Sequence, residues 1–534
     1  MKKLLSILVM LAMVLSFAAA SAESIVTPAG QLPIVTEPYT LRVAVPTDAK
    51  VENIKETKLT QWLEETTGIT LEFIELSTSD TATQVNMMMN SGDLPDVFLG
   101  YDFPYDALCS YVDAGLILPV DEYVAEYASE EGYKRFLNEF PLENPEAYVT
   151  VDGQMYAVLA GGAMVTNIYA SNGIRLQDQF LQTLGLEDPQ TLEEFYNYLV
   201  AVRDNDVNGN GDPNDEVPLT SHTATNWGKN LLRTIGTAYQ YTEPNDFLKV
   251  NDGTVEFVAN NDLFKETVLF LKKLVDEKLL EPAAFTQDAM TLASRQQGEA
   301  PVFGAYAVGN SSDGFDTSSD NYKSAIWCPP LEGPHGYRAT NYSAPYVYRT
   351  KVITTACEHP EVAFRLCDFL LTEEASVAFR LGFEGSEWEK AAEGELGRNG
   401  EQAKYKLLKP QEWIQPTTNV IWNNENVTFA NTMNFVYEAP DSPTGRAAAN
   451  MIRANFQAYV TNEYMPALLM DIETSAEYAE LKKLIADYVN ENVALFVLGE
   501  KDMAEWDKYV AELDAMGVEQ YVKMAQEAYD AMFK

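Results

Sequence analysis

The first hundred residues alternate between two hydrophobic periods. Apolar side chains recur at every second position in residues 41–45 and 69–73, as in strands with one buried face. They recur at helical spacing in residues 59–63 and 85–89, and residues 96–99 form a short apolar run typical of a buried strand. This order of strand, helix, strand, helix and strand predicts a mostly parallel sheet covered by helices.

Helical spacing dominates the later part of the chain. It predicts helices at residues 192–202 and 263–275. Residues 481–496 keep the same rhythm, and Gly499 is placed to end that helix. We therefore expect a packed helical region in the C-terminal quarter. A chain of 534 residues is long enough for two large lobes.

The N-terminus has the three parts of a secretory signal peptide. Two lysines precede an apolar run up to about Leu15, and small residues follow up to Ala22. Residues 1–22 are interpreted as a cleaved signal, because the apolar run is too short to span a bilayer and its flanks disfavour a buried helix. The protein is therefore expected to be exported and to act outside the cytoplasm.

The chain is strongly acidic. It carries 80 acidic and 37 basic residues, and its formal net charge is −43. A negative field of this size repels phosphate backbones and anionic lipids, so we expect binding neither to nucleic acid nor to a membrane surface. It also disfavours a polyanionic substrate such as a uronate polymer, although a local basic pocket would override it.

The four cysteines, Cys109, Cys328, Cys357 and Cys367, form no C-x-x-C pair. Export permits a disulfide, and four cysteines allow three complete pairings between which the sequence does not choose. Buried free thiols are the simpler interpretation, since Cys367 lies in an apolar stretch typical of a core helix.

One loop, residues 204–216, carries the pattern of a calcium site. Calcium takes six to eight oxygen ligands, which alternate side chains of a tight loop supply from one side. In an EF-hand-like register that begins at Asp206, oxygen-bearing side chains fall at positions one, three and five, and Gly211 falls at position six, where the turn is sharp. The expected ligands are Asp206, Asn208, Asn210, Asp212 through its backbone oxygen, Asp215 and Glu216.

This register departs from the EF-hand pattern because no Glu falls at position twelve. A second register, beginning at Asp204, places Asp215 there. A solvated Asn/Gly turn without metal is the alternative, since these residues are ordinary turn formers. The number of oxygen-bearing side chains around two glycines exceeds what a turn needs, so we expect a structural Ca²⁺.

Residues for catalysis are scarce. The chain has three histidines, none at metalloprotease spacing, and it has neither a G-x-S-x-G elbow nor a P-loop. The sequence does not exclude a carboxylate pair for glycoside hydrolysis among the 80 acidic residues, because the separation of two carboxylates depends on the fold. We expect a binding protein that is not an enzyme, with a secreted glycoside hydrolase as the alternative.

Several tryptophans lie in stretches rich in Asn, Thr, Ser or Glu, such as residues 225–228 and 422–424. A flat ring beside amides suits a sugar, which has apolar faces and polar edges. The expected ligand contacts are Trp227, Trp327, Trp422 and Tyr346. For each tryptophan, packing in a core is the alternative.

Several motifs, taken in order, resemble the extracellular solute-binding proteins of ABC transporters, in the branch that includes oligosaccharide-binding and alginate-binding receptors. The motifs are LTQWLEETTGI at 59–69, NSGDLPD at 90–96, DGQMY at 152–156, LGL at 184–186, TLEEF at 191–195 and the Asn-Gly-Asn-Gly loop before residues 215–218. The resemblance covers nearly the whole chain after residue 22. It does not extend to the family's lipidated cysteine, because the first cysteine here is Cys109.

The resemblance implies a two-lobed α/β fold of the type II periplasmic-binding-protein kind, with ligand held in the cleft between lobes that close on binding. We place lobe 1 at residues 38–160 plus 300–360, and lobe 2 with the helical C-terminal region at 161–299 plus 361–534. The implied function is a monomeric extracytoplasmic receptor that delivers an oligosaccharide to the permease subunits of an ABC importer. A peptide ligand and a sensory role are the alternatives.

Overall fold

The computed structural model describes residues 25–534 except 141–143, 163–172, 223–229, 296–299, 309–319, 341–345, 398, 410–416, 423, 425–426, 438, 440–448, 451 and 471. The predicted signal peptide and Trp227 therefore lie outside the described residues. Within the described part of the chain, no helix is long and apolar enough to cross a membrane.

Six strands form the first sheet, in the order β16-β6-β13-β3-β1-β2. Their bounds are β1 Tyr39–Thr47, β2 Ile69–Ser77, β3 Val97–Leu99, β6 Val158–Gly162, β13 Tyr346–Ile353 and β16 Phe429–Ala430. β1 pairs in parallel with both β2 and β3, as the alternating pattern predicts. β13 runs antiparallel to its neighbours β3 and β6.

Helices cover this sheet and share one hydrophobic core with it. They are α2 Lys58–Thr67, α3 Thr81–Ser91, α4 Tyr105–Asp113, α5 Asp121–Tyr127, α6 Tyr133–Glu139, α14 Pro360–Phe369 and α15 Glu373–Leu381. In α2 the Thr57 side chain accepts the Thr60 N–H, and Gly68 ends the helix with a φ of 75°. Leu59 and Leu63 are buried in the core, as their spacing predicts.

Four strands form the second sheet, in the order β12-β7-β11-β8. Their bounds are β7 Gly173–Gln177, β8 Val217–Ser221, β11 Phe303–Val308 and β12 Ala325–Trp327. β11 runs parallel to β8 and antiparallel to β7. The helices that follow these strands are α8 Asp178–Leu184, α9 Leu192–Asp204, α10 Asn230–Gly236, α11 Asp262–Asp276, α12 Ala289–Arg295 and α13 Asp320–Lys323.

The sequence pattern explains two of these helices. In α9, Thr191 and Glu194 form a capping box that closes the first turn. In α11, the Asn261 side chain accepts the Phe264 N–H, and Phe264, Val268 and Leu271 are buried on one face. A second hydrophobic core, separate from the first, collects these helices.

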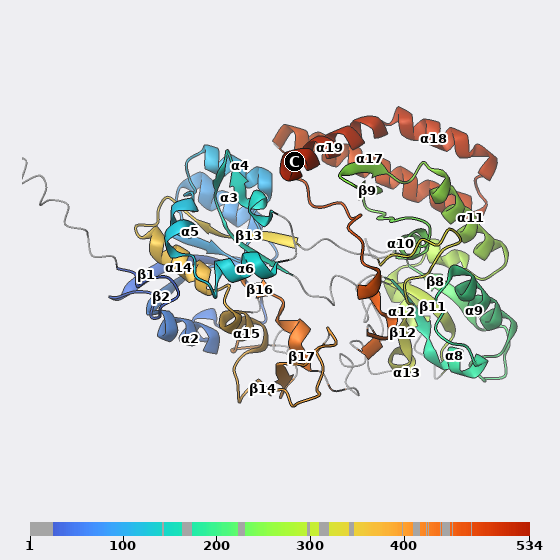
Figure 1. Cartoon of the computed structure of the whole chain (residues 1–534), viewed down its shortest axis with the longest axis horizontal. Helices are drawn as coiled ribbons and strands as arrows, with labels where there is room; N and C mark the ends of the chain where they lie inside the picture. Colours follow the sequence, from blue (N-terminus) through green and yellow to red (C-terminus); the bar gives the residue numbers. More distant parts are fainter. Residues whose placement is uncertain are drawn as a thin grey trace, which may run out of the picture.

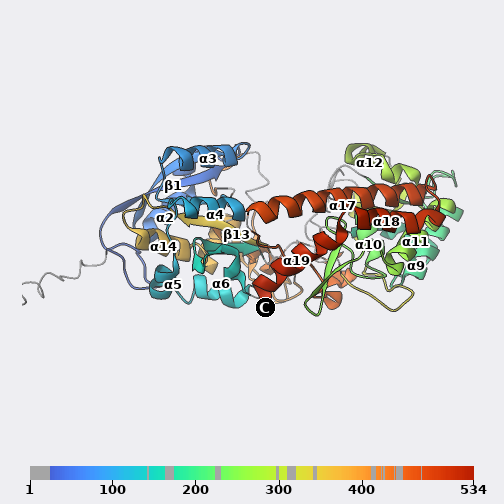
Figure 2. The same ribbon diagram turned by 90° about the horizontal axis from the view of Figure 1, so that it is seen from above.

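Three helices end the chain: α17 Ile472–Leu498, α18 Trp506–Ala515 and α19 Val518–Phe533. They run along one side of the molecule and lie against both lobes (Figures 1 and 2). Most of their buried residues belong to the second core, but Met532 belongs to the first, and the Asn144 side chain donates to its carbonyl oxygen at 3.3 Å. The predicted helical C-terminal region is confirmed.

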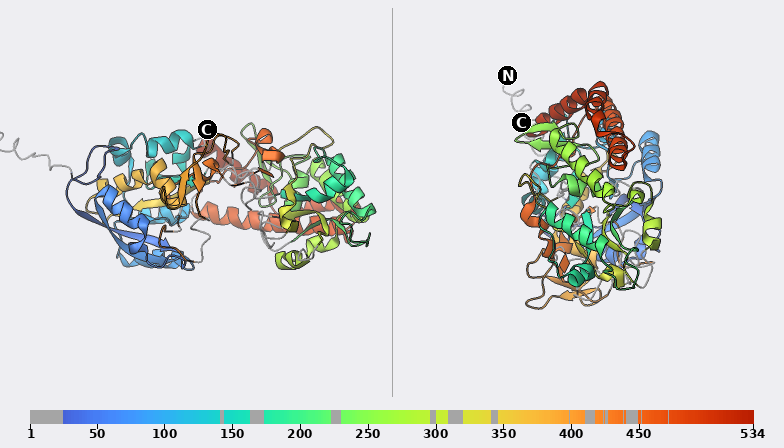
Figure 3. Two further views of the ribbon diagram at one scale, coloured as in Figure 1. Left: turned by 90° about the horizontal axis from the view of Figure 1, so that it is seen from below. Right: turned by 90° about the vertical axis from the view of Figure 1, so that its right-hand side faces the viewer.

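Short strands complete the fold: β4 Thr150–Val151, β5 Gln154–Met155, β9 Leu248–Asn251, β10 Thr254–Phe257, β14 Trp388–Lys390, β15 Tyr405–Leu407 and β17 Val436–Tyr437. The view along the long axis shows the lobes one behind the other, with the C-terminal helices at one edge (Figure 3).

The lobe boundaries differ from the predicted ones in two places. β11 and β12 fall in residues 300–360, which the sequence assigned to lobe 1, but both belong to the second sheet. α14 and α15 fall in residues 361–534, which it assigned to lobe 2, but they pack in the first core. Strand pairing depends on contacts between residues far apart in the chain, which local periodicity does not report.

The four cysteines are free thiols in this structure. Cys328, Cys357 and Cys367 are buried, and Cys109 is half-buried.

A buried lysine lies in the middle of the first sheet. Lys351, in β13, is fully buried, and its Nζ donates to the Leu159 carbonyl oxygen at 2.6 Å. Burial lowers the pKa of Lys351 from 10.5 to about 7, because the charged ammonium loses its water, while nearby Cys367 and Asp368 oppose the shift.

We expect Lys351 to contribute a component of the free energy of unfolding that rises with pH between about 7 and 10.5, seen as the difference between wild type and Lys351→Met. In this interval the unfolded chain keeps the proton on Lys351 and the folded chain releases it, so the unfolded state binds more protons. The contribution approaches about 1.4 kcal/mol per pH unit. Lys351→Met removes it, whereas Lys523→Met, at a residue 65% exposed, keeps it. Urea denaturation across this pH range measures both, and equal slopes for wild type and Lys351→Met would contradict the assignment.

Candidate functional site

The ends of the strands in the two sheets face each other across the middle of the molecule (Figure 1). β6 ends at Gly162 in the first sheet, and Gly173 begins β7 in the second. β8, β11 and β12 end beside this start of β7, since Val308 pairs with Gly173 and Trp327 pairs with Arg175. Ligands of α/β proteins bind outside the carboxyl ends of strands, so this facing pair of edges is the candidate site.

A stacked pair of side chains marks the edge of the second sheet. The guanidinium carbon of Arg175 lies 4.5 Å from the centroid of the Trp327 ring, and Arg175 Nη2 donates to the Ala325 carbonyl oxygen at 3.2 Å. Phe456 meets the same indole edge-on, with centroids 6.3 Å apart. The cation–π contact and the aromatic contact hold Trp327 in one orientation.

The indole N–H of Trp327 has an unusual environment. Trp327 is 2% exposed, and among the described residues its Nε1 has no hydrogen-bond acceptor. A buried donor without an acceptor costs about 1–3 kcal/mol. A ligand oxygen that reached this nitrogen would remove that cost.

The edge of the first sheet is also polar. Asp102 follows β3, and its Oδ1 accepts the Arg349 backbone N–H at 2.8 Å. Burial raises the pKa of Asp102, and the Arg349 guanidinium opposes the shift. Gly100 has a φ of 91°, and a Cβ there would lie 2.2 Å from Asn424 Nδ2, so only glycine fits.

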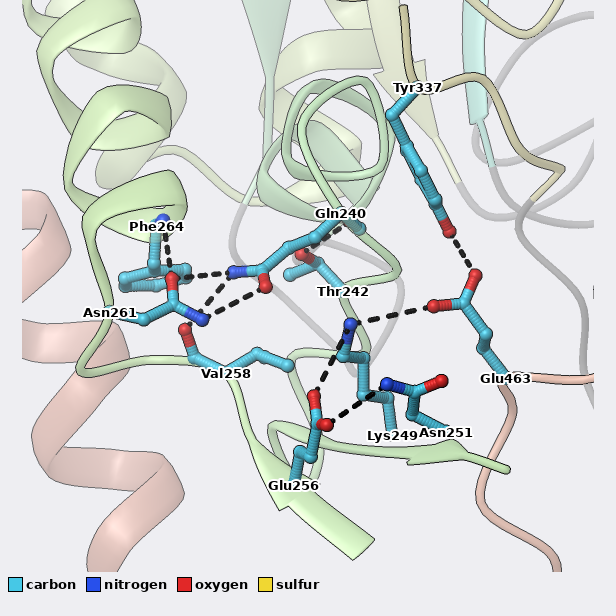
Figure 4. A network of polar contacts seen from close by, with 10 residues as sticks. All are labelled: Gln240, Thr242, Lys249, Asn251, Glu256, Val258, Asn261, Phe264, Tyr337 and Glu463. Carbon is cyan, nitrogen blue, oxygen red and sulfur yellow. Dashed lines mark hydrogen bonds and ion pairs between the residues drawn. The ribbon is translucent and has the colours of Figure 1, made fainter. Parts of the chain in front are cut away.

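Two segments that cross between the lobes are fastened to lobe 2. The Thr340 N–H donates to the Tyr459 carbonyl oxygen at 2.8 Å, and the Tyr337 hydroxyl donates to Glu463. Glu463 also pairs with Lys249 of β9 at 3.5 Å (Figure 4). Both segments are fixed at their lobe 2 ends. A movement of one lobe against the other would therefore change the backbone of these segments nearer lobe 1.

The same network extends into lobe 2 (Figure 4). Glu256 binds Lys249 at 3.5 Å and accepts from Asn251 Nδ2 at 3.1 Å. Gln240 and Asn261 exchange two side-chain hydrogen bonds of 2.9 Å each. Asn261 also caps α11, and Gln240 donates to the carbonyl oxygen of Val258, directly after β10, at 3.2 Å.

The structure separates the predicted ligand contacts. Trp327 lies at the edge of the second sheet. Trp422 lies in the core of lobe 1, where its indole N–H donates to Thr60 Oγ1 at 2.8 Å and its ring packs against Phe379. Trp422 therefore has the position and partners of a packing residue. Tyr346 begins β13, and its side chain lies outside the described residues, as does Trp227.

Sequence reasoning missed Arg175 and Phe456. An arginine in the buried strand Gly173–Gln177 is the signal that could have identified the first, because a charge is rarely placed in a fully buried strand without a specific role. Phe456 lies more than a hundred residues from Trp327 in the chain, and no local pattern joins the two.

The predicted calcium loop lies between α9 and β8 in lobe 2. Its side chains bend the backbone: Asp206 accepts the Gly209 and Gly211 N–H groups at 2.8 and 2.9 Å, and Asn208 accepts the Asn210 N–H at 2.9 Å. Asn210 and Asp212 each accept an N–H two residues on. Asp215 accepts from the side-chain amides of Asn208 and Asn210.

Glu216 closes the loop. Its Oε1 accepts the Val207 and Asn208 N–H groups at 2.8 and 3.2 Å, whereas its Oε2 is buried without a hydrogen-bond partner among the described residues. Burial raises the pKa of Glu216, and the hydrogen bonds from the backbone N–H groups partly oppose this shift. Asp204 is bound instead by the Arg203 guanidinium at 2.8 and 3.1 Å, which favours the register that begins at Asp206.

The described residues contain no cluster of three or more His, Cys, Asp or Glu side chains arranged to hold a metal. The donor set of the loop, all oxygen with one buried carboxylate oxygen unpartnered, nevertheless fits a hard cation.

The fold agrees with comparisons to known proteins. A model of the bacterial extracellular solute-binding protein family matches residues 44–377. The chain belongs to this family. The predicted family and the predicted two-lobed α/β fold are confirmed, and the family is one of binding proteins.

Individual known proteins of similar sequence or structure have low sequence identity to this chain. FusA of Streptococcus pneumoniae, a fructooligosaccharide ABC transporter substrate-binding protein, is 26% identical over 486 residues, which cover 89% of this chain and 87% of FusA. A solved HMO-binding protein associated with an ABC transporter, from Bifidobacterium longum infantis, has a TM-score of 0.72 at 20% identity and covers 92% of this chain and 99% of its own. A solved EF-hand mutant of S. pneumoniae FusA with fructo-nystose has a TM-score of 0.63 at 21% identity, with the same coverage.

We expect Trp422→Phe to destabilise the protein more than Trp327→Phe, by about 1–3 kcal/mol. Both changes remove the same volume, but the first removes a hydrogen bond to Thr60 and the second removes a donor without an acceptor. Urea denaturation of the two variants measures the difference. Equal losses would show that the environments of the two indole nitrogens do not differ in this way.

Proposed function

We propose that this protein is an extracytoplasmic receptor for a neutral oligosaccharide and delivers it to the permease subunits of an ABC importer. The observation that carries this proposal is the Arg175–Trp327 pair at the edge of the second sheet, which faces the strand ends of the first. Among the described residues the buried indole N–H of Trp327 has no acceptor, and a sugar hydroxyl would supply one.

The comparisons support a carbohydrate ligand, and they include both neutral and acidic glycans, since one relative is named for polygalacturonan and rhamnogalacturonan. One relative is named for a fructooligosaccharide and another for an HMO, and the FusA mutant was solved with fructo-nystose. The acidic surface of this chain, with a formal net charge of −43, favours a neutral glycan over a polyanionic one. The signal sequence and the extracellular family support export. We propose that the protein acts as a monomer.

The proposed mechanism is a population shift. A ligand that contacts both edges at once gains its full binding energy only when the lobes are closed, so it stabilises the closed state. The network of Lys249, Glu463 and Tyr337 keeps the crossing segments with lobe 2 during this movement. The permease would then recognise the closed form, with no chemical change to the ligand.

We expect Trp327→Phe to weaken the binding of a neutral fructo-oligosaccharide about tenfold, or roughly 1.4 kcal/mol. The change keeps an apolar ring and removes the N–H, so it isolates the hydrogen bond to a ligand oxygen. Trp422→Phe is the matched control, because the same change in the lobe 1 core leaves the affinity unaltered. Isothermal titration of the mature protein measures both variants.

The same titration includes oligogalacturonates and short peptides. Binding of peptides and not of sugars would overturn the substrate class and leave a receptor. Release of smaller sugars on prolonged incubation would overturn the receptor and indicate a glycoside hydrolase.

We further propose that the loop 206–216 binds a structural Ca²⁺ through Asp206, Asn208, Asn210, Asp212, Asp215 and Glu216. The hard oxygen donors, the unpartnered Glu216 oxygen and the presence of an EF-hand in the similar protein FusA support it. The loop precedes β8, whereas the candidate ligand edge follows it. A five-residue strand spans about 16 Å, so the ion would stabilise lobe 2 without touching the ligand.

We expect calcium to raise the melting temperature and a chelator to reverse the change. At a hundredfold excess over the dissociation constant, the stabilisation is about 2.7 kcal/mol. Asp206→Asn and Glu216→Gln weaken the response, whereas Asp204→Asn, the same substitution at a carboxylate bound to Arg203, leaves it unchanged. If only Asp204→Asn abolished the effect of calcium on the melting temperature, the ligands would follow the register that begins at Asp204. No response in wild type would contradict the site.

A further inference from the structure

A cavity lies in lobe 1, outside the facing strand edges. It has a volume of about 520 Å³ and is lined by four parts of the chain: the segment before β1, the turn between α5 and α6, α6 itself, and the junction of α14 with α15. None of its lining residues belongs to a strand end or to a crossing segment. A volume of this size accommodates a small molecule.

The buried part of the cavity contains a guanidinium without an ion-pair partner. Arg365 of α14 is 2% exposed, and its Nη2 donates to the Gln31 carbonyl oxygen at 2.8 Å. Its Nε is buried with no acceptor, and no carboxylate of the described residues lies within ion-pair distance of it. Burial lowers the pKa of Arg365, and Asp368 only partly opposes the shift.

The carboxylate nearest along the helix is already in use. Asp368 also lines the cavity, but its oxygens accept from the Ser129 N–H at 3.0 Å, the Ser129 hydroxyl at 2.6 Å and the Tyr133 N–H at 2.9 Å. A buried charge that lacks a partner is costly, so an anionic group that entered the cavity would bind here.

The rim of the cavity has the opposite charge. Glu131 and Glu374 are exposed, line the cavity, and have no ion pair among the described residues. The other rim carboxylates are paired: Glu130 with Lys134, Glu139 with Arg135 and Glu373 with Lys404. A simple anion would be repelled at this rim, and a simple cation would leave Arg365 without a partner.

We infer that this cavity binds a small zwitterion, with its carboxylate on Arg365 and its ammonium group at Glu131 and Glu374. Leu32, Ile34 and Phe369 line the same cavity and provide apolar surface for the body of the ligand. A free amino acid or a short peptide with an apolar side chain has this combination of groups. This inference does not depend on the proposed oligosaccharide site or on the result of the experiment that tests it.

Three probes with one apolar body test the charge pattern. Leucine carries both charged groups, N-acetyl-leucine lacks the ammonium group, and leucinamide lacks the carboxylate. Isothermal titration of the full mature chain at millimolar concentrations is expected to show binding of leucine or dileucine, at least about tenfold tighter than that of either single-charge analogue. No binding of any zwitterion, or equal binding of either analogue, would overturn the inference.

Substitutions assign the two ends of the ligand. Arg365→Gln is expected to abolish zwitterion binding, and Glu374→Gln to weaken it without changing the weak binding of N-acetyl-leucine. Because Arg365 also holds the segment before β1, circular dichroism and the melting temperature check the fold of that variant. The exposed Glu131→Gln and Glu374→Gln variants test the site even where Arg365→Gln fails to fold. Unchanged zwitterion affinity in both glutamate variants would overturn the inference.

Discussion

The strand β13 enters the middle of the first sheet only after the chain has passed through the second lobe. It pairs with β3 on one side and β6 on the other, with Lys351 opposite both Leu99 and Val158. Lobe 1 therefore cannot complete its sheet until lobe 2 has been traversed. The crossing segments that this route requires bring the strand ends of the two sheets to face each other, and the candidate site lies between those ends.

The side chains at these edges are held by contacts within each lobe. Arg175 and Trp327 are positioned by one another and by Phe456, while Asp102 is tied to Arg349 on the other side. The crossing segments are fastened to lobe 2 through Glu463 and Lys249. Each edge is therefore held by contacts within its own lobe, and the proposed closure would move one edge toward the other. A receptor that signals occupancy by closure needs a division between rigid lobes and a mobile junction.

Local sequence patterns predicted the elements whose structure depends on local contacts. The alternation in residues 41–45 corresponds to β1, and the apolar face of residues 263–275 corresponds to α11, which Asn261 caps. The predicted lobe boundaries were wrong where a strand joins its sheet by pairing with strands far away in the sequence. β11, for example, pairs with β7 and β8 of the second sheet. The predicted ligand residues Trp327 and Trp422 are both buried, and only tertiary packing places the first at the edge of the second sheet and the second in the core of lobe 1. The loop 206–216 could be proposed as a calcium site from the sequence because such a site depends on the spacing of oxygen-bearing residues within one short segment.

Small-angle X-ray scattering can measure whether the lobes close around a neutral oligosaccharide, because closure makes the molecule more compact. The radius of gyration of the mature protein, saturated with calcium, is measured with and without a fructo-oligosaccharide. We expect a smaller radius with the sugar, and no such change with a peptide. Saturating sugar that binds and leaves the radius unchanged would contradict closure as the signal to the permease.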